Sequence, residues 1–237
     1  MKRRASLGFV FVLLIGVFAA VPALADPIVG LPAVDDNCIP FGCAYAGLYQ
    51  QVYSSDAFSG PIVIKDIEFF NTEFDNFATA MNSGTWTISL STTTAGPASL
   101  GSTFASNIGA GNTQVFSGNL SQPWAFGDTL TISLMTPFLY NPSLNNNLLL
   151  TVDAAGVTEP DGNPIFFDRG GSSDIGRVWQ FSTASTGTVN MVDADFGLVT
   201  GFDGVPPSVP EPGSWLLLGT GLLGLGILIV RRKFAIQ

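Results

Sequence analysis

Residues 85–93, TWTISLSTT, decide the fold class because apolar and polar side chains alternate along them. Trp86, Ile88 and Leu90 lie on one face of an extended chain, and the threonine and serine residues between them lie on the other. A strand of this kind buries one face against a core and exposes the other to solvent. The segment therefore predicts a strand of an antiparallel sheet.

The same alternation recurs along the chain. Residues 128–135, DTLTISLM, repeat it, and residues 146–154, NNLLLTVDA, add a continuous apolar run that predicts burial on both faces. The apolar faces of these two segments consist of Leu130, Ile132 and Leu134 in the first and Leu148, Leu150 and Val152 in the second. Further candidate strands are GPIVIKDIEFF (60–70), TQVFSGNL (113–120), NPIFFDR (163–169), GRVWQFS (176–182) and VNMVDADFGLVTGF (189–202).

Segments rich in Gly, Asn, Asp and Pro separate these runs, and such residues favour turns. Helical periodicity never persists for three turns, although residues 70–84, FNTEFDNFATAMNSG, leave open a short helical turn or a long loop. Many short strands joined by turns predict an all-β fold, an antiparallel β-sandwich or jelly-roll-like single domain. The 187 residues from Asp26 to Pro212 suffice for one such domain.

The N-terminus has the features of a secretory signal peptide. Three basic residues, Lys2 to Arg4, precede an apolar run from Leu7 to Ala20, and Ala23 and Ala25 occupy the positions that signal peptidase inspects. We expect a signal peptide helix over residues 1–25, cleaved after Ala25. A retained membrane helix is the alternative, but the run of 14 residues is shorter than the roughly 20 that a span needs.

Charge and composition exclude several function classes. Between Asp26 and Pro212 only Lys65, Arg169 and Arg177 oppose 18 acidic residues, a formal charge of about −15. Such a domain repels phosphate backbones, so we expect no nucleic-acid partner. The chain has no histidine, which removes the usual general base and the commonest zinc ligand. We therefore expect a non-enzymatic protein.

The two cysteines, Cys38 and Cys43, lie close together in the segment CIPFGC. A secreted chain passes through an oxidising compartment, where such a pair tends to form a disulfide. Closing this small loop contributes about 2 kcal/mol by the chain-entropy estimate. A redox-active or metal-binding pair is the alternative, but the CxxC spacing and further ligands are missing.

Two carboxylate pairs have the spacing of a catalytic acid and base. Asp66 and Glu68 share one face of a predicted strand at about 7 Å, as do Asp193 and Asp195. Glycosidases use carboxylates roughly 5 to 9.5 Å apart. Any i, i+2 acid pair on a strand meets this condition, and a solvated outer face explains it equally well. We therefore expect no catalytic residues.

Ligand sites receive weaker support. Glu159, Asp161 and Asn163 in EPDGN offer oxygen ligands for Ca²⁺, but no D-x-D-x-D-G loop is present, and a turn capped by its own side chains is favoured. We expect no cofactor, with Ca²⁺ as the alternative. Aromatic side chains could stack on sugars, although we expect most of them in the core. The candidates are Tyr45, Tyr49, Tyr53, Trp86, Trp124, Tyr140 and Trp179.

The C-terminus combines three elements in order. A Pro-rich linker (205–213) contains Pro210, Glu211 and Pro212, and a Gly-rich apolar segment follows from Trp215. The apolar segment of 16 to 18 residues gives about 24 to 27 Å of helix, just enough to span a membrane. The positive-inside rule then places Arg231, Arg232 and Lys233 in the cytoplasm. A permanent single-span anchor is one interpretation of this tail.

This order closely resembles the PEP-CTERM sorting signal of exopolysaccharide-producing Gram-negative bacteria. The resemblance rests on Pro210-Glu211-Pro212, the Gly-rich helix opening with Trp215, and the basic cluster Arg231 to Lys233. It implies that an exosortase-like membrane protease recognises the tail and cuts near the Pro-Glu-Pro motif. The precursor would be inserted in the inner membrane, and the mature form would reach the cell surface or the extracellular space.

Three further segments resemble recurring motifs of uncharacterised secreted β-sandwich domains. They are YQQVY (49–53), FFDRGGSSDIGRV (166–178) and FGLVTGF (196–202). The resemblance implies a β-sandwich and assigns no activity.

The sequence therefore divides into a signal peptide (1–25), a β-sandwich domain (26–204), a Pro-rich linker (205–213) and a hydrophobic sorting helix with a basic tail (214–237). We expect an exported surface or matrix protein, processed by signal peptidase and an exosortase-like protease and associated with exopolysaccharide. A secreted carbohydrate-binding or carbohydrate-active domain and a permanently anchored periplasmic protein are the alternatives.

Overall fold

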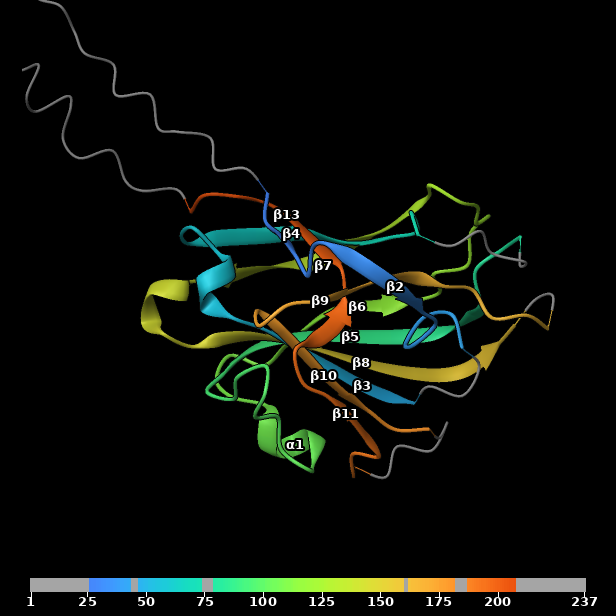
Figure 1. The fold of residues 1–237 in the computed structure, drawn as a ribbon. Helices are drawn as coiled ribbons and strands as arrows, with labels where there is room; N and C mark the ends of the chain where they lie inside the picture. Colours follow the sequence, from blue (N-terminus) through green and yellow to red (C-terminus); the bar gives the residue numbers. More distant parts are fainter. Residues whose placement is uncertain (1–25, 44–46, 74–78, 160–161, 182–186, 208–237) are drawn as a thin grey trace, which may run out of the picture.

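The computed structural model describes residues 26–43, 47–73, 79–159, 162–181 and 187–207 as an all-β fold (Figure 1). A four-stranded sheet and a six-stranded sheet form two layers, and a smaller three-stranded sheet lies along one side. Every strand pair is antiparallel, which confirms the all-β antiparallel prediction. The third sheet was not predicted.

The four-stranded sheet has the order β1-β13-β4-β7. Its strands are β1 (Ile28–Val29), β13 (Thr200–Val205), β4 (Ile62–Phe70) and β7 (Thr129–Tyr140). Burial alternates along β4 and β7, so that Leu130 and Ile132 face the core as the sequence pattern predicts. β13 is a central strand of this sheet and extends to Val205, one residue into the predicted linker.

The six-stranded sheet has the order β11-β10-β3-β8-β5-β6. Its strands are β11 (Met191–Asp193), β10 (Ile175–Trp179), β3 (Leu48–Tyr53), β8 (Asn147–Thr158), β5 (Ser83–Thr93) and β6 (Thr113–Gly118). Trp86, Ile88 and Leu90 on β5 are fully buried, which confirms the alternation of residues 85–93. Leu148 to Leu150 on β8 are also buried, so both faces of this stretch are covered.

The three-stranded sheet has the order β12-β9-β2 and comprises β12 (Phe196–Leu198), β9 (Phe167–Gly171) and β2 (Ala33–Asn37). β12 belongs to residues 189–202, which the sequence pattern treats as one strand. That prediction is wrong, because the segment divides into β11, β12 and the start of β13, one in each sheet. Asp195 has φ 58°, a left-handed conformation that ends β11 and redirects the chain.

One hydrophobic core joins the three sheets. Its members come from both large sheets and from β9 and β12 of the small sheet. β6 packs beside β7 on one side of the sandwich, and the small sheet fills the other side between β10 and β4. Phe41, Phe69 and Phe167 meet in this core with ring centroids 4.8 and 5.9 Å from Phe41. The third sheet therefore covers one side of the core between the two large sheets.

Helices are few among the described residues. Two 3-10 helices, η1 (Ser55–Ala57) and η2 (Pro142–Leu144), contact each other, and α1 (Phe104–Asn107) is a single turn in the connection between β5 and β6. Of the ambiguous segment 70–84, residues 74–78 lie outside the described residues. Its described flanks hold the end of β4, an isolated bridge at Ala80 and the start of β5, without a helix.

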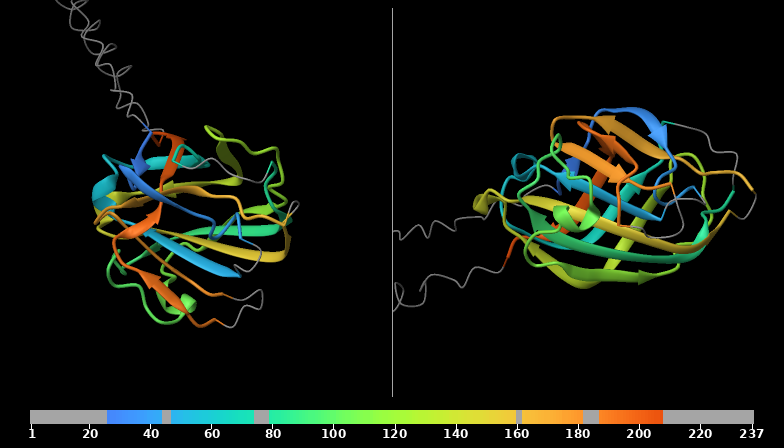
Figure 2. Two further views of the ribbon diagram at one scale, coloured as in Figure 1. Left: turned by 45° about the vertical axis from the view of Figure 1, so that its right-hand side comes forward. Right: turned by 90° about the horizontal axis from the view of Figure 1, so that it is seen from below.

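The α1 connection lies over the outer face of β3 in the six-stranded sheet (Figure 2). The Gln50 Nε2 atom on β3 donates a hydrogen bond to the Phe104 carbonyl at 3.0 Å, and the Asn107 Nδ2 atom donates to Gln50 Oε1 at 2.9 Å. Because β3 also faces the core, Tyr49 to Tyr53 are all buried. The YQQVY segment is therefore a central strand covered on both faces.

A chain of buried polar contacts, the polar row, joins the large sheet to the other two. The Gln51 Nε2 atom donates to the Leu198 carbonyl at 2.8 Å, and the Leu198 N–H donates to Gln51 Oε1 at 2.8 Å. The Tyr53 hydroxyl donates to Thr200 Oγ1 at 3.0 Å, and the Tyr49 hydroxyl donates to Gln51 Oε1. One side-chain amide therefore pairs with the Leu198 backbone as a neighbouring strand would.

The two tyrosines of the polar row stay protonated. Burial, the largest cause, raises the pKa of Tyr49 to about 12, and burial also raises the pKa of Tyr53 well above its ordinary value. Both hydroxyls therefore remain neutral donors at any physiological pH. The row also brings two of the resembled segments into contact, since YQQVY provides Gln51 and FGLVTGF provides Leu198 and Thr200.

Replacing Gln51 by leucine should destabilise the fold by about 2–4 kcal/mol, because the buried Leu198 N–H and the Tyr49 hydroxyl lose their acceptor. Urea unfolding followed by tryptophan fluorescence measures the loss. Gln114→Leu is the matched control, since Gln114 is an exposed glutamine on β6, and it should change stability by less than about 0.5 kcal/mol. Equal effects of the two substitutions would contradict this account.

Candidate functional site at the chain-exit edge

The two ends of the described domain meet at one edge, which we call the chain-exit edge (residues 26–29 and 200–207; Figure 1). β1 pairs with β13 through Ile28 opposite Gly201 and Val29 opposite Thr200. The Phe202 N–H donates to the Pro27 carbonyl at 3.0 Å. The first residues after the predicted signal peptide therefore run beside the strand that leads into the linker.

At the N-terminal end of this pairing, the side chain of Asp26 contacts β13. Its Oδ1 atom accepts a hydrogen bond from the Gly204 N–H at 3.4 Å. A small pocket lies beside it, lined among others by Phe58, Pro61 and Pro206. Asp26, the residue that follows the predicted cleavage point, therefore contacts β13 through its side chain, and Pro27 contacts it through its backbone.

The predicted sorting motif lies close to this edge in the sequence. Pro210 follows Val205, the last residue of β13, by five residues, and Trp215 follows it by ten. A fully extended chain covers at most about 3.6 Å per residue, which bounds the two separations to about 18 and 36 Å. The linker therefore keeps the domain near any membrane or enzyme that holds the tail.

The first predicted carboxylate pair lies on the outer face of the four-stranded sheet beside this edge. Asp66 is opposite Asp203 on β13, and Glu68 is opposite Gly201. Burial raises the pKa of Glu68, and the neighbouring charges of Asp203, Asp66 and Asp26 raise it further, whereas a hydrogen bond with Thr131 lowers it. The Ser133 hydroxyl donates to Asp66 Oδ1 at 2.6 Å. These carboxylates form an acidic surface rather than an isolated acid and base.

The second carboxylate pair is divided between two structural roles. Asp193 Oδ2 accepts two hydrogen bonds from Arg177, from Nη2 at 2.7 Å and from Nε at 3.0 Å. Asp195 forms the left-handed turn after β11, and its carbonyl accepts from the Ser172 N–H at 3.0 Å. The two carboxyl groups therefore do not act as one pair.

The candidate calcium loop is described in part. Asp161 lies outside the described residues, while the Gly162 N–H donates to the Glu159 carbonyl at 3.4 Å and Gly162 has φ 66°. Glu159 and Gly162 are thus joined through their backbones. Across the part of the chain that the structure describes, no three acidic or cysteine side chains gather so that they could hold a metal ion.

The aromatic side chains considered for sugar stacking belong to the core. Tyr49, Tyr53, Trp86, Trp124, Tyr140 and Trp179 are all at most 5% exposed. A stacking platform built from these six residues is therefore wrong, because their rings fill the space between the sheets. Tyr45 lies outside the described residues.

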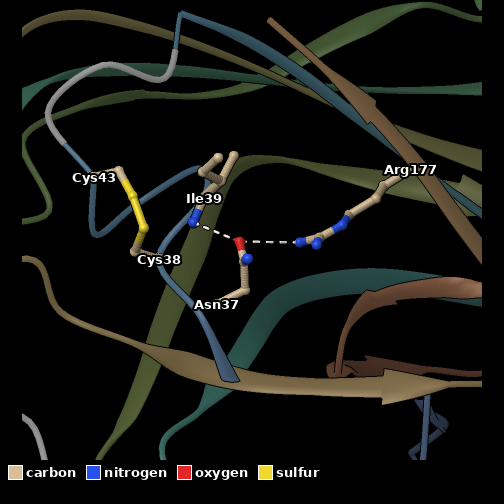
Figure 3. Close-up of a disulfide and its surroundings, with 5 residues drawn as sticks. All are labelled: Asn37, Cys38, Ile39, Cys43 and Arg177. Carbon is tan, nitrogen blue, oxygen red and sulfur yellow. Dashed lines mark hydrogen bonds between the residues drawn. A yellow bond between two sulfur atoms is a disulfide. The ribbon is translucent and has the colours of Figure 1, made fainter. Parts of the chain in front are cut away.

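The structure joins Cys38 and Cys43 in a disulfide at the end of β2 (Figure 3). The remaining site predictions fall outside the described residues. They are the cleavage positions Ala23 and Ala25, the motif Pro210, Glu211 and Pro212, and the basic cluster Arg231, Arg232 and Lys233. Within the described ranges, none of the helices has the length and apolar character that a membrane span requires.

Sequence reasoning missed the residues that position these features. Gln51 and Asn37 carry no motif for a site, yet Gln51 holds Leu198 and Asn37 contacts Arg177. The available signal was a pair of glutamines inside a strand otherwise formed by Tyr, Val and Leu. Buried polar residues of this kind need specific partners, which only the fold reveals.

Glu68→Gln should remove a pH-dependent loss of stability. The raised pKa lets the folded state bind a proton more readily than the unfolded state, whose value lies near the ordinary 4.5. The free energy of unfolding therefore falls as pH rises from 4.5 through the raised pKa. Unfolding measured between pH 4 and pH 8 should show the advantage of Glu68→Gln growing over this window. Asp203→Asn should bring the pKa of Glu68 closer to 4.5. A Glu68→Gln advantage that is constant with pH would contradict the assignment.

Comparison with known proteins identifies the tail. The PEP-CTERM protein-sorting motif matches residues 208–233, a range that runs through Pro210-Glu211-Pro212 and the apolar segment to Lys233. No curated protein matches the chain. This motif marks a protein for export and for processing by an exosortase-like membrane protease. The sequence-based prediction of the tail is confirmed: the chain carries a PEP-CTERM sorting motif directly behind a β-rich domain.

Proposed function

We propose that this chain is the precursor of a non-enzymatic surface or matrix protein. Its tail holds it in the inner membrane until an exosortase-like protease cuts near Pro210-Glu211-Pro212, and the β-domain is then delivered outside the cell. The match of residues 208–233 to the sorting motif carries this proposal. The matched range begins three residues after the end of β13, so the chain passes from the domain almost directly into the motif.

The chain-exit edge supports this topology. Asp26 lies just before β1, and Val205 ends the neighbouring strand β13, so a signal peptide before Asp26 and a tail after Val205 would approach the membrane from the same edge. The basic clusters at Lys2 to Arg4 and Arg231 to Lys233 favour the cytoplasmic side for both tips. The domain would then stand outside the membrane on two short tethers.

The chemistry of the domain supports a binding or structural role. Three of the candidate carboxylates have hydrogen-bond or ion-pair partners: Asp66 with Ser133, Glu68 with Thr131 and Asp193 with Arg177. The outer face of β5 and β6 offers hydroxyl groups, such as Thr87 opposite Ser117, that could bond to a polysaccharide. In this proposal the mature domain binds exopolysaccharide through such polar surfaces. The candidate aromatic side chains take no part, because they are buried in the core.

Intact-mass analysis after cell fractionation tests the proposal. In cells with the protease, the extracellular protein should lack residues from Leu216 onward, and in cells without it the full tail should remain on membrane-bound protein. Glu211→Ala should lower the processed fraction by at least about tenfold, because a recognition site discriminates strongly against a substrate that lacks a bonded group. Glu159→Ala is the matched control, since Glu159 also precedes a proline.

Unchanged mass and location in cells without the protease would refute processing. A mature protein that retains its tail in the membrane in every strain would instead support the permanently anchored alternative. Mature protein that is processed but shows no retention on the cell's own exopolysaccharide would refute the matrix association alone.

A further inference from the structure

The disulfide closes a loop that fills one end of the core. Phe41, within this loop, is fully buried, and Cys43 is 1% exposed. The Gly42 N–H donates to the Cys38 carbonyl at 2.6 Å, and the Gly42 carbonyl accepts from the Ile165 N–H at 3.1 Å. The loop is therefore a plug whose shape depends on both its crosslink and its backbone hydrogen bonds.

A buried cation lies next to this plug. The Arg177 side chain on β10 has no exposed surface, and its Cζ atom lies 4.6 Å from the centroid of the Trp179 ring. Asp193 on β11 accepts from Nε and Nη2, while Nη1 donates to Asn37 Oδ1 at 3.1 Å. A buried guanidinium needs each of these acceptors, because removing one leaves a charged donor unpaired.

Asn37 joins the plug to the cation through one oxygen atom. Its Oδ1 atom accepts from the Ile39 N–H at 2.9 Å and from Arg177 Nη1 at 3.1 Å (Figure 3). Ile39 belongs to the loop that the disulfide closes. Loss of the loop conformation therefore removes the bond that orients Asn37 toward Arg177.

We propose that the Cys38–Cys43 disulfide is a redox latch that holds Asn37 against the buried Arg177. Closed, the latch fixes β2 of the small sheet to β10 of the large sheet. When the disulfide is reduced, Asn37 is released, and the Arg177 guanidinium loses one of its hydrogen-bond acceptors. Closing it converts two thiols into one S–S bond, while two electrons and two protons pass to a protein disulfide oxidant, which becomes a dithiol.

Because of the latch, export changes how tightly the small sheet is held against the large sheet. In a reducing compartment the joint between the small and large sheets stays loose, and it tightens when the chain meets an oxidant outside the inner membrane. This consequence rests on the proposed export. The coupling between the disulfide and Arg177 does not, so the latch can be tested on purified protein whether or not the tail is processed.

The test compares the full chain in detergent before and after reduction by dithiothreitol, with thiol titration to verify that both cysteines are free. Reduction should speed limited proteolysis by about 30-fold, the factor expected for releasing a loop of this size. It should also change tryptophan emission, because Arg177 lies over Trp179. Trp179→Phe should abolish that change, which assigns it to this ring.

The coupling is tested by combining reduction with Asn37→Ala. Oxidised Asn37→Ala should already show part of the emission change, and reduction should then speed proteolysis by clearly less than in the unaltered chain. Asn37→Asp retains an oxygen acceptor and should respond to reduction as the unaltered chain does. Asp35→Ala is the matched control on β2, because it breaks the exposed ion pair with Arg169, and its effect should add to that of reduction.

Equal acceleration by reduction in Asn37→Ala and in the unaltered chain would overturn the latch, since the disulfide and Arg177 would then be independent. An unchanged Trp179 emission with both thiols titrated would overturn it as well. If Asn37→Ala does not fold, two other variants test the proposal: Asn37→Asp, and a double variant with Cys38→Ser and Cys43→Ser. Asn37→Asp should still respond to reduction as the unaltered chain does. The double variant should match the reduced chain in emission and proteolysis, and a match to the oxidised chain would contradict the proposal.

Discussion

The need to pair polar groups inside the core fixes how the three sheets meet. Gln51 is fully buried, and both its amide nitrogen and its amide oxygen bind the backbone of Leu198. Arg177, directly across from Gln51 on β10, binds Asp193 and Asn37. These partners come from β2, β11 and β12, so an alternative packing of the sheets would leave buried donors unsatisfied.

The same contacts position the strand that leads to the sorting motif. Leu198 and Thr200 flank the crossover from β12 to β13, and Gln51 binds both. β13 then passes between β1 and β4 and ends at Val205, shortly before the sorting motif. The buried row thus determines the edge from which the linker leaves, although it lies inside the domain and the motif lies outside it.

Local patterns were sufficient for part of this fold. Alternation in residues 85–93 and 128–135 correctly placed β5 and β7, and the contiguous tail motif was recognisable without any fold. Long-range partners were not predictable. The turn at Asp195 separates β11 from β12, and a break at Val199 separates β12 from β13, so one apolar run is divided among three sheets. The burial of Trp86 and Trp179 follows from what packs over them rather than from composition. Asn37 and Gln51 acquire roles only when β2, β3 and β12 come together.

Hydrogen exchange at the Leu198 amide tests the central interaction most directly, because its acceptor is a side-chain oxygen and not a strand. The account predicts that this amide exchanges only through global unfolding, as slowly as the amides of Leu149 and Leu150 in β8. Exchange of the Leu198 amide on the timescale of exposed loops, with β8 still protected, would show that Gln51 does not hold the sheets together.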